Sequence, residues 1–145
     1  MRMSSMGQLG EFVVNHWLLV LALVVIVALL LMDAMKRRVL GFQDIKPQEA
    51  VRLINHDGAV VVDVREDKEY HEGHVLNAVH IPYGLMEERL DELDAYKAQP
   101  LIVYCRTGQR SAQAGVLLRR QGFERVYKLS GGMLAWRGAD LPVVK

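Results

Sequence analysis

A run of sixteen consecutive apolar residues, Trp17 to Met32, limits the folds open to this chain because it contains no charged side chain. With the apolar residues just before it, the segment Phe12–Met32 has 21 residues. At about 1.5 Å per residue, such a helix matches the roughly 30 Å hydrocarbon core of a bilayer. The segment is too long for an ordinary buried core helix, and it lacks the basic start and small-residue cleavage site of a secretory signal. We therefore expect an uncleaved membrane-spanning helix.

Basic residues at the two ends of this segment predict its orientation. Lys36, Arg37 and Arg38 follow the apolar run, whereas only Arg2 and the terminal amine precede it. The positive-inside rule then places the carboxyl side in the cytoplasm. For a bacterial protein, this predicts a single-pass inner-membrane (plasma-membrane) protein. The lipid bilayer is an expected partner, with anionic headgroups as a further contact for the basic group.

The remainder of the chain has the size of one ordinary domain. A formal net charge of +1 gives no support to nucleic-acid binding. The hydrophobic share of 51% averages a membrane helix with a soluble region. We expect four parts: an N-terminal tail (1–11), a transmembrane helix (12–32), a juxtamembrane linker (33–42) and one domain (43–145).

Strand patterns alternate with helix patterns along this domain. Ala59–Val64 and Leu101–Tyr104 are continuous apolar runs, which are typical of strands buried on both faces of a parallel sheet. Shorter strands are expected over 43–45, 78–82 and 126–129, and helical segments over 47–57, 66–71, 86–93, 111–121 and 133–137. The alternation predicts a doubly wound α/β domain with a mostly parallel sheet flanked by helices.

Cys105 is the only cysteine, and it directly follows the buried strand that ends at Tyr104. A short loop containing Gly108 separates it from the next helix, so backbone N–H groups and a helix N-terminus face whatever lies above the sulfur. These groups, with Arg106 and Arg110 nearby, favour a thiolate beside an anion site. Because a second cysteine is absent, the chain suits a reducing compartment. A buried, inert thiol is the alternative.

Around this cysteine the chain resembles the rhodanese-like domain family of sulfurtransferases, in the single-domain form with an N-terminal membrane anchor. The resemblance runs from about Ile45 to the end of the chain. The motifs that carry it stand in this order: Asp63-Val64-Arg65, Glu69-Tyr70, Gly73-His74-Val75, Ala78 with Ile81-Pro82, Cys105-Arg106-Thr107-Gly108-Gln109-Arg110-Ser111, and Gly131-Gly132 with Trp136.

The resemblance implies transfer of a sulfane sulfur with Cys105 as the catalytic nucleophile. Its thiolate would take sulfur from a small anionic donor such as thiosulfate, release sulfite, and pass the sulfur from the persulfide to a thiol or protein acceptor. Neither a cofactor nor a metal ion is expected. Physiological donor and acceptor cannot be read from the sequence, because they depend on the surface around the pocket.

The resemblance also assigns roles to the loop that follows the cysteine. The substrate-binding residues would be Arg106, Thr107, Gly108, Gln109, Arg110 and Ser111. Their backbone N–H groups would cradle the donor's oxygens, and Gly108 would supply a positive φ. Arg106 and Arg110 would balance the charge of a dianion. Alternatively, the Arg110 guanidinium fastens the loop to the sheet.

Structural roles are expected for the other motif residues. For Asp63 and Arg65, an ion pair between Arg65 and Glu69 is favoured over acid–base work. The Gly73-His74 pair is expected to form a turn, since a thiolate of low pKa needs no general base. Gly132, after Gly131, is expected in a turn, and Trp136 in the core or a lid.

Two other functional classes compete with sulfur transfer. A tyrosine-phosphatase-like enzyme has five residues between its cysteine and arginine, whereas four separate Cys105 from Arg110, so the loop should be too tight for a phosphate ester. A membrane-tethered binding or regulatory module without catalysis is the closer alternative. An intact cysteine within an intact loop favours chemistry over binding alone.

Overall fold

The computed structural model describes residues 5–145, and the side chains of that range except those of residues 5, 6, 37, 38 and 40. The chain divides into two units between Val39 and Leu40. Arg2 and the terminal amine, which enter the orientation argument, lie outside the described residues. The side chains of Arg37 and Arg38 do too.

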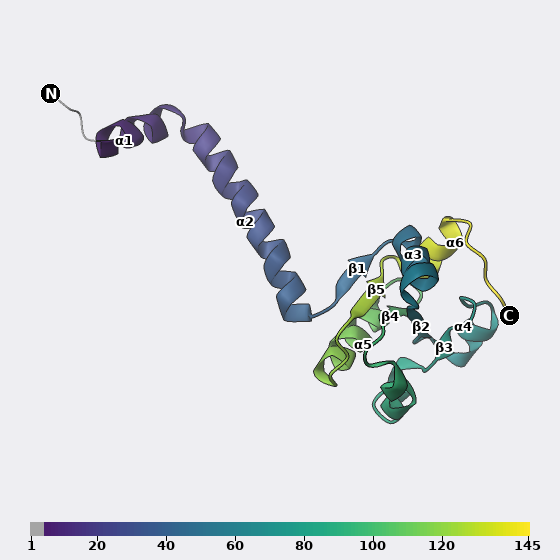
Figure 1. Cartoon of the computed structure of the whole chain (residues 1–145). Coiled ribbons are helices and arrows are strands. Elements are labelled where there is room, and N and C mark those ends of the chain that lie inside the picture. The colour runs from purple at the N-terminus through teal and green to yellow at the C-terminus, as the bar shows by residue number, and fades with distance from the viewer. Residues whose placement is uncertain (1–4) are drawn as a thin grey trace. The chain divides into compact units, whose positions relative to one another are not determined.

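The N-terminal unit consists of two helices interrupted at His16, α1 (Ser5–Asn15) and α2 (Trp17–Leu40) (Figure 1). Within α2, the 20 residues Trp17–Lys36 contain an 18-residue window with a mean hydropathy of 3.0 and no buried residue, so this helix is long and apolar enough to cross a membrane. The segment begins and ends later than the expected Phe12–Met32, because the interruption places Phe12 on α1. α2 also continues through most of the expected linker.

The C-terminal unit is built on a five-stranded sheet with the order β1-β5-β4-β2-β3. Every neighbouring pair is parallel, which confirms the expected α/β architecture. The strands are β1 (Gln43–Ile45), β2 (Val60–Asp63), β3 (Val79–His80), β4 (Leu101–Tyr104) and β5 (Val126–Leu129). The helices are α3 (Pro47–Asp57), α4 (Asp67–His71), α5 (Gln109–Arg120) and α6 (Gly132–Gly138), with the 3-10 helices η1 (Tyr83–Leu85) and η2 (Leu90–Tyr96).

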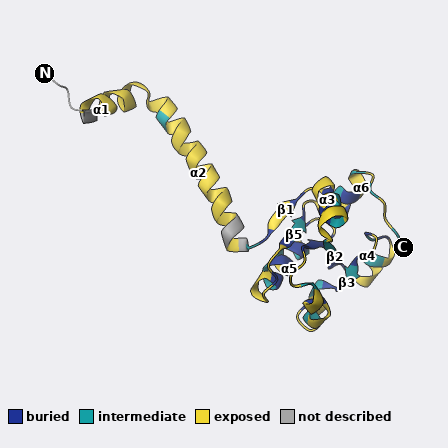
Figure 2. Ribbon diagram, in the orientation of Figure 1, coloured by how far each residue is buried: buried dark blue, intermediate teal, exposed yellow. Residues whose placement is uncertain are grey.

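Side chains of β4 alternate between two hydrophobic clusters, one on each side of the sheet. Leu101 and Val103 join the cluster that includes buried residues of α5. Ile102 and Tyr104 join the cluster that includes buried residues of α3 and α6. Both faces of the strand are therefore covered, as its continuous apolar run predicts, and Figure 2 shows the buried strands inside an exposed outer shell. Cys105 continues the alternation and lies on the α5 side.

The segment between β3 and β4 differs from the single helix that its apolar spacing predicts. It contains the two short 3-10 helices η1 and η2 instead. Met86 and Leu93 are fully buried, whereas Leu90 is only partly buried. The spacing of the apolar residues therefore predicts which side chains enter the core. It does not predict the type of helix, because short 3-10 turns can bury the same residues.

Candidate active site

Cys105 lies at the carboxyl edge of the middle strand of the sheet. β4 is hydrogen-bonded to β2 on one side and to β5 on the other. α5 begins at Gln109, two residues before the expected start, so the connection from strand to helix is short. Only 1% of Cys105 is exposed. The sulfur is thus held near the N-terminus of α5, at the sheet edge where α/β domains place ligands.

Two groups of the loop contact the sulfur directly. The backbone N–H of Gly108 donates a hydrogen bond to Cys105 Sγ at 3.0 Å. The hydroxyl Oγ of Ser111 lies 3.4 Å from Sγ and also donates to the carbonyl oxygen of Gly108 at 3.1 Å. Gly108 has a φ of 131°, in the region that only glycine adopts easily. This backbone conformation aims its N–H at the sulfur. Thr107 and Gln109 are exposed on the outer side of the loop.

These contacts change the pKa of the thiol. Burial of Cys105 opposes ionisation, but hydrogen bonds from the Ser111 hydroxyl and from backbone N–H groups of Ser111, Gly108 and Thr107 favour the thiolate. The balance lowers the pKa of Cys105 below its ordinary value. Hydrogen bonding, and not a neighbouring carboxylate or imidazole base, is therefore the cause of the lowered pKa.

Arg110 forms a two-pronged ion pair with Glu69 of α4. Its two terminal nitrogens lie 2.7 and 2.9 Å from the two carboxylate oxygens. The pair holds the pKa of Glu69 at about 2, chiefly through the hydrogen bonds from Arg110. The expected pairing of Arg65 with Glu69 is therefore wrong, since Glu69 is committed to Arg110. Arg110 fastens the start of α5 to α4, which differs from the expected attachment to the sheet.

Arg65 and Asp63 form a buried pair with each other. Arg65 Nη2 lies 2.6 Å from Asp63 Oδ2 and also donates to the carbonyl oxygen of Gly73 at 2.8 Å. The phenol of Tyr104 donates to the same carboxylate at 2.6 Å and accepts the backbone N–H of Val75 at 3.1 Å. No buried side-chain nitrogen or oxygen of the pair lacks a hydrogen-bond partner, and the network holds the chain around Gly73 against the end of β4.

His74 contacts α4 and the carboxyl-terminal segment and not the cysteine. Its Nδ1 lies 3.0 Å from the carbonyl oxygen of Tyr70, and the two rings stack with centroids 3.8 Å apart. Its backbone exchanges two hydrogen bonds with Val144 near the carboxyl end. The two backbone bonds make an isolated antiparallel bridge to Val144, where a turn was expected, and none of these contacts involves Cys105.

Gly132 lets α6 approach the catalytic loop closely. Its φ is 56°, and a Cβ atom there would overlap the Cys105 carbonyl oxygen and lie 2.7 Å from the carbonyl carbon of Arg106. The next residue, Met133, donates its N–H to that Cys105 oxygen at 2.8 Å. Trp136 is buried, with its indole N–H donating to the carbonyl oxygen of Pro142 at 3.0 Å. α6 is therefore attached to the first residues of the loop.

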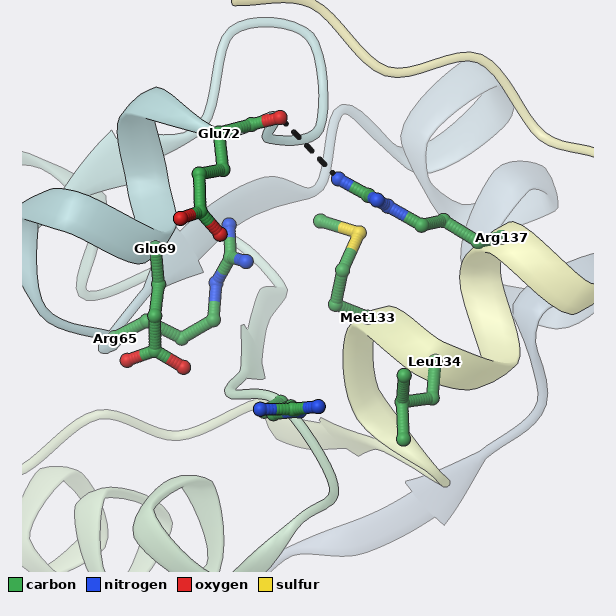
Figure 3. A pocket seen from close by; sticks show the side chains of 7 residues that line it. Arg65, Glu69, Glu72, Met133, Leu134 and Arg137 are labelled. Carbon is green, nitrogen blue, oxygen red and sulfur yellow. Dashed lines mark hydrogen bonds between the residues drawn. The ribbon is translucent and has the colours of Figure 1, made fainter.

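A pocket of about 160 Å³ lies between α4, α6 and the loop (Figure 3). Its lining residues are Arg65, Glu69, Glu72, Arg106, Met133, Leu134 and Arg137. Sequence reasoning identified Arg106 but missed the α6 contribution. Arg137 follows Met133 by one helical turn, and this spacing next to the Gly131-Gly132 turn was the only available signal. Within residues 5–145, no group of three or more His, Cys, Asp or Glu side chains is placed to hold a metal ion.

Comparisons with known proteins agree with this geometry. The model of the rhodanese-like domain matches residues 46–139. The uncharacterized protein YibN of Escherichia coli K12 is 30% identical over 141 residues, covering 97% of this chain and 99% of its own. The thiosulfate sulfurtransferase GlpE of Actinobacillus pleuropneumoniae serotype 5b is 36% identical over 102 residues, or 70% of this chain and 93% of its own.

The fold also resembles that of a solved rhodanese-related protein. A crystal structure of a rhodanese-related protein from Thermoplasma volcanium superposes with a TM-score of 0.65 at 28% identity, covering 71% of this chain and 98% of that chain. The matched family segment includes strands β2 to β5, the cysteine loop and α6. The chain belongs to the rhodanese-like sulfurtransferase family.

Proposed function

We propose that this protein is a membrane-anchored sulfurtransferase that carries a sulfane sulfur on Cys105. The observation that supports this most directly is the sulfur held at 3.0 Å from the Gly108 N–H and 3.4 Å from the Ser111 hydroxyl. Those donors favour the thiolate, which is the nucleophile in sulfur transfer. They also stay in place to stabilise the anionic persulfide that forms.

The proposed reaction has two displacements, each of which breaks and forms one bond to sulfur. The Cys105 thiolate attacks the outer sulfur of thiosulfate, the sulfur–sulfur bond of the donor breaks, and sulfite leaves with the electron pair. The products are sulfite and a persulfide anion on Cys105. An acceptor thiolate then attacks the terminal sulfur, takes it, and regenerates the Cys105 thiolate. The transferred sulfur keeps its sulfane oxidation level in both steps, so neither an oxidant nor a reductant is needed.

Loading of Cys105 tests this function. After incubation with thiosulfate, the full chain in detergent should gain one sulfur atom in intact-protein mass spectrometry, and an added thiol should remove it. Cys105→Ser should gain nothing. A matched control moves the cysteine to an exposed position, Leu76→Cys in the Cys105→Ser background. If the moved cysteine loads equally well, the loop is not responsible. If the unaltered chain stays unloaded, a non-catalytic binding module is the better description.

We infer that the charge of the donor is balanced by Arg106 and Arg137 and not by Arg110. The Arg110 guanidinium is already paired with Glu69. Arg106 and Arg137 both line the pocket, and Figure 3 shows Arg137 reaching from α6 toward α4. The Arg137 Nη2 donates only a long hydrogen bond of 3.4 Å, to the backbone carbonyl of Glu72. Its charge is therefore available to an anion.

Removing Arg137 should weaken donor binding more than turnover. We expect Arg137→Ala to raise KM for thiosulfate about 10-fold while kcat changes little, the loss typical of one charge-assisted contact. Steady-state kinetics with a fixed thiol acceptor would measure both constants. Arg120→Ala, which removes an exposed guanidinium at the far end of α5, is the control. An unchanged KM in Arg137→Ala would exclude Arg137 from donor binding.

We also propose that α2 anchors the protein in the inner membrane with the C-terminal unit in the cytoplasm. The length and hydropathy of α2 support the anchoring, and the sequence Lys36-Arg37-Arg38 after its apolar run supports the orientation. The single-cysteine composition agrees with a reducing compartment. In that place the protein would deliver sulfur at the cytoplasmic surface of the membrane.

A further inference from the structure

α1 is amphipathic, with all its described side chains exposed. At 3.6 residues per turn, most of its apolar and polar residues separate onto two sides of the helix. Leu9, Phe12 and Val13 form the apolar face and are 64%, 56% and 45% exposed. The polar face carries Gln8, Glu11 and Asn15, and Val14 lies between the two faces, next to Glu11. Within the described part of the chain, nothing covers the apolar face of this helix.

α1 cannot share the hydrocarbon core with α2. The uncharged residues Trp17–Met32 of α2 extend about 24 Å, and the helix continues through Asp33 to Lys36, so α2 can cover most of the roughly 30 Å of that core by itself. An extension of the span by α1 would also carry the charge of Glu11 into lipid, which is strongly unfavourable. The opposite placement, in water, would leave the apolar face of α1 exposed. Neither environment alone satisfies both faces.

The joint between the helices allows a third placement. The helix is interrupted at His16, whose Nδ1 lies 3.1 Å from the Phe12 carbonyl oxygen and whose ring stacks on the Phe12 ring at 4.6 Å. Trp17 then begins α2, and an indole at the end of a span is typical of the headgroup level. With only His16 between them, the end of α1 must lie at the same membrane surface as the start of α2.

We propose that α1 lies in the lipid–water interface, with Leu9, Phe12 and Val13 inserted at the boundary between headgroups and acyl chains. The occupant of its apolar face is thus the leaflet in which α2 begins. This placement rests on the membrane anchoring proposed above. It satisfies both faces, because Gln8, Glu11 and Asn15 then remain in water.

The charge of α1 determines which lipids it fits. Between Ser5 and Asn15 the helix contains Glu11 and neither lysine nor arginine. Attraction to anionic headgroups therefore cannot hold it, and its affinity comes from the buried apolar side chains. A zwitterionic leaflet is sufficient. By contrast, the basic residues from Lys36 onward are expected to contact anionic headgroups.

Site-directed spin labelling of the full chain tests this placement. Cys105→Ser removes the only cysteine, and single cysteines are then placed by Leu9→Cys, Phe12→Cys, Gln8→Cys and Glu11→Cys. The labelled proteins are reconstituted into phosphatidylcholine vesicles, and collisions of the label with oxygen and with a water-soluble nickel chelate are compared. The ratio of oxygen to nickel collisions should be several-fold higher at Leu9 and Phe12 than at Gln8 and Glu11. Phosphatidylglycerol should leave this difference unchanged.

Three results would overturn the proposal. High nickel accessibility at all four positions would place α1 in water, and high oxygen accessibility at all four would make it part of the span. Low accessibility to both reagents on the apolar face would identify a protein contact instead of lipid. A label at Val24→Cys in α2 separates these results from a failure of anchoring, because it should report lipid whenever α2 spans the bilayer.

Discussion

The Ser111 hydroxyl has one proton and two neighbours that can accept it. The Gly108 carbonyl oxygen lies 3.1 Å from Oγ, and Cys105 Sγ lies 3.4 Å from it. While the sulfur is protonated, its S–H can donate to Oγ, and the hydroxyl donates to Gly108. Once the sulfur is charged, the hydroxyl can turn toward it. Ser111 therefore stabilises the thiolate without removing a proton from it.

Replacement of Ser111 should make the thiol harder to ionise. In Ser111→Ala the pKa of Cys105 should rise by about 1 to 2 units, because a hydrogen bond to a charged group contributes about 1.5 to 3 kcal/mol. The pH at which thiosulfate loading begins should rise with it. Thiolate absorbance against pH, corrected with Cys105→Ser, measures the change, and Ser130→Ala is the exposed control. An unchanged pKa would assign the stabilisation to backbone N–H groups alone.

At the scale of elements, Glu69 connects two helices that are far apart in the sequence. Its Oε2 accepts the backbone N–H of Glu66 at 3.1 Å and so caps the start of α4. The same carboxylate binds Arg110 in α5, 41 residues away. One side chain therefore caps the N-terminus of α4 and also sets the position of α5, which begins beside the sulfur.

Neutralising Glu69 should destabilise the fold in a pH-dependent way. Its folded pKa of about 2 is below the ordinary 4.5, so its contribution is complete above pH 4.5 and disappears as the pH falls toward 2. Glu69→Gln should lower the free energy of unfolding by about 1 kcal/mol at pH 7, since the pair is partly exposed. The loss should be smaller at pH 3.

Urea unfolding of the full chain in detergent, followed by near-ultraviolet circular dichroism, measures this effect at both pH values. Asp94→Asn breaks an exposed pair with Lys97 that is three residues apart, and it should cost much less. An equal loss at pH 7 and pH 3 would show that the charge of Glu69 is not what stabilises the contact.

The elements were predictable where the cause of their formation is local. The buried strands β2 and β4, the start of α3 at Pro47 and the turn before α6 follow from runs of apolar residues, proline and glycine. The Arg65–Glu69 pair was predicted from a four-residue spacing and was wrong. The actual partner of Arg65 is Asp63, two residues before it, and the Gly73 carbonyl and the Tyr104 phenol join this network only after separate elements have packed together.

In the site, too, contacts between residues close in the sequence were predictable, and contacts between separate elements were not. Cys105, Gly108 and Ser111 lie within seven consecutive residues that join β4 to the first turn of α5, so their proximity could be read from the sequence. Arg137 reaches the pocket from α6, and no spacing relates it to Cys105. Contacts that depend on the packing of separate elements could not be predicted from one sequence.

For the whole molecule, the basic residues after α2 should control which side of the membrane holds Cys105. Protease added to intact spheroplasts should spare the C-terminal unit and cut it only after permeabilisation of the inner membrane. Lys36, Arg37 and Arg38 changed to Gln, together with Ser4→Lys and Ser5→Lys, should invert part of the population, because short flanking segments follow the charge bias. Digestion of the unaltered protein from outside would place Cys105 in an oxidising compartment and contradict cytoplasmic delivery.

The near-complete enclosure of Cys105 has a consequence for the delivery of its cargo. With 1% of the residue exposed, an acceptor must bring its thiolate into the loop to reach a sulfur atom bound there. A small added thiol should still discharge the loaded molecule, whereas a protein acceptor needs a shape that lets its own thiol enter the loop. Loading of the sulfur and its delivery are then separate events, and the shape of the acceptor determines when delivery occurs.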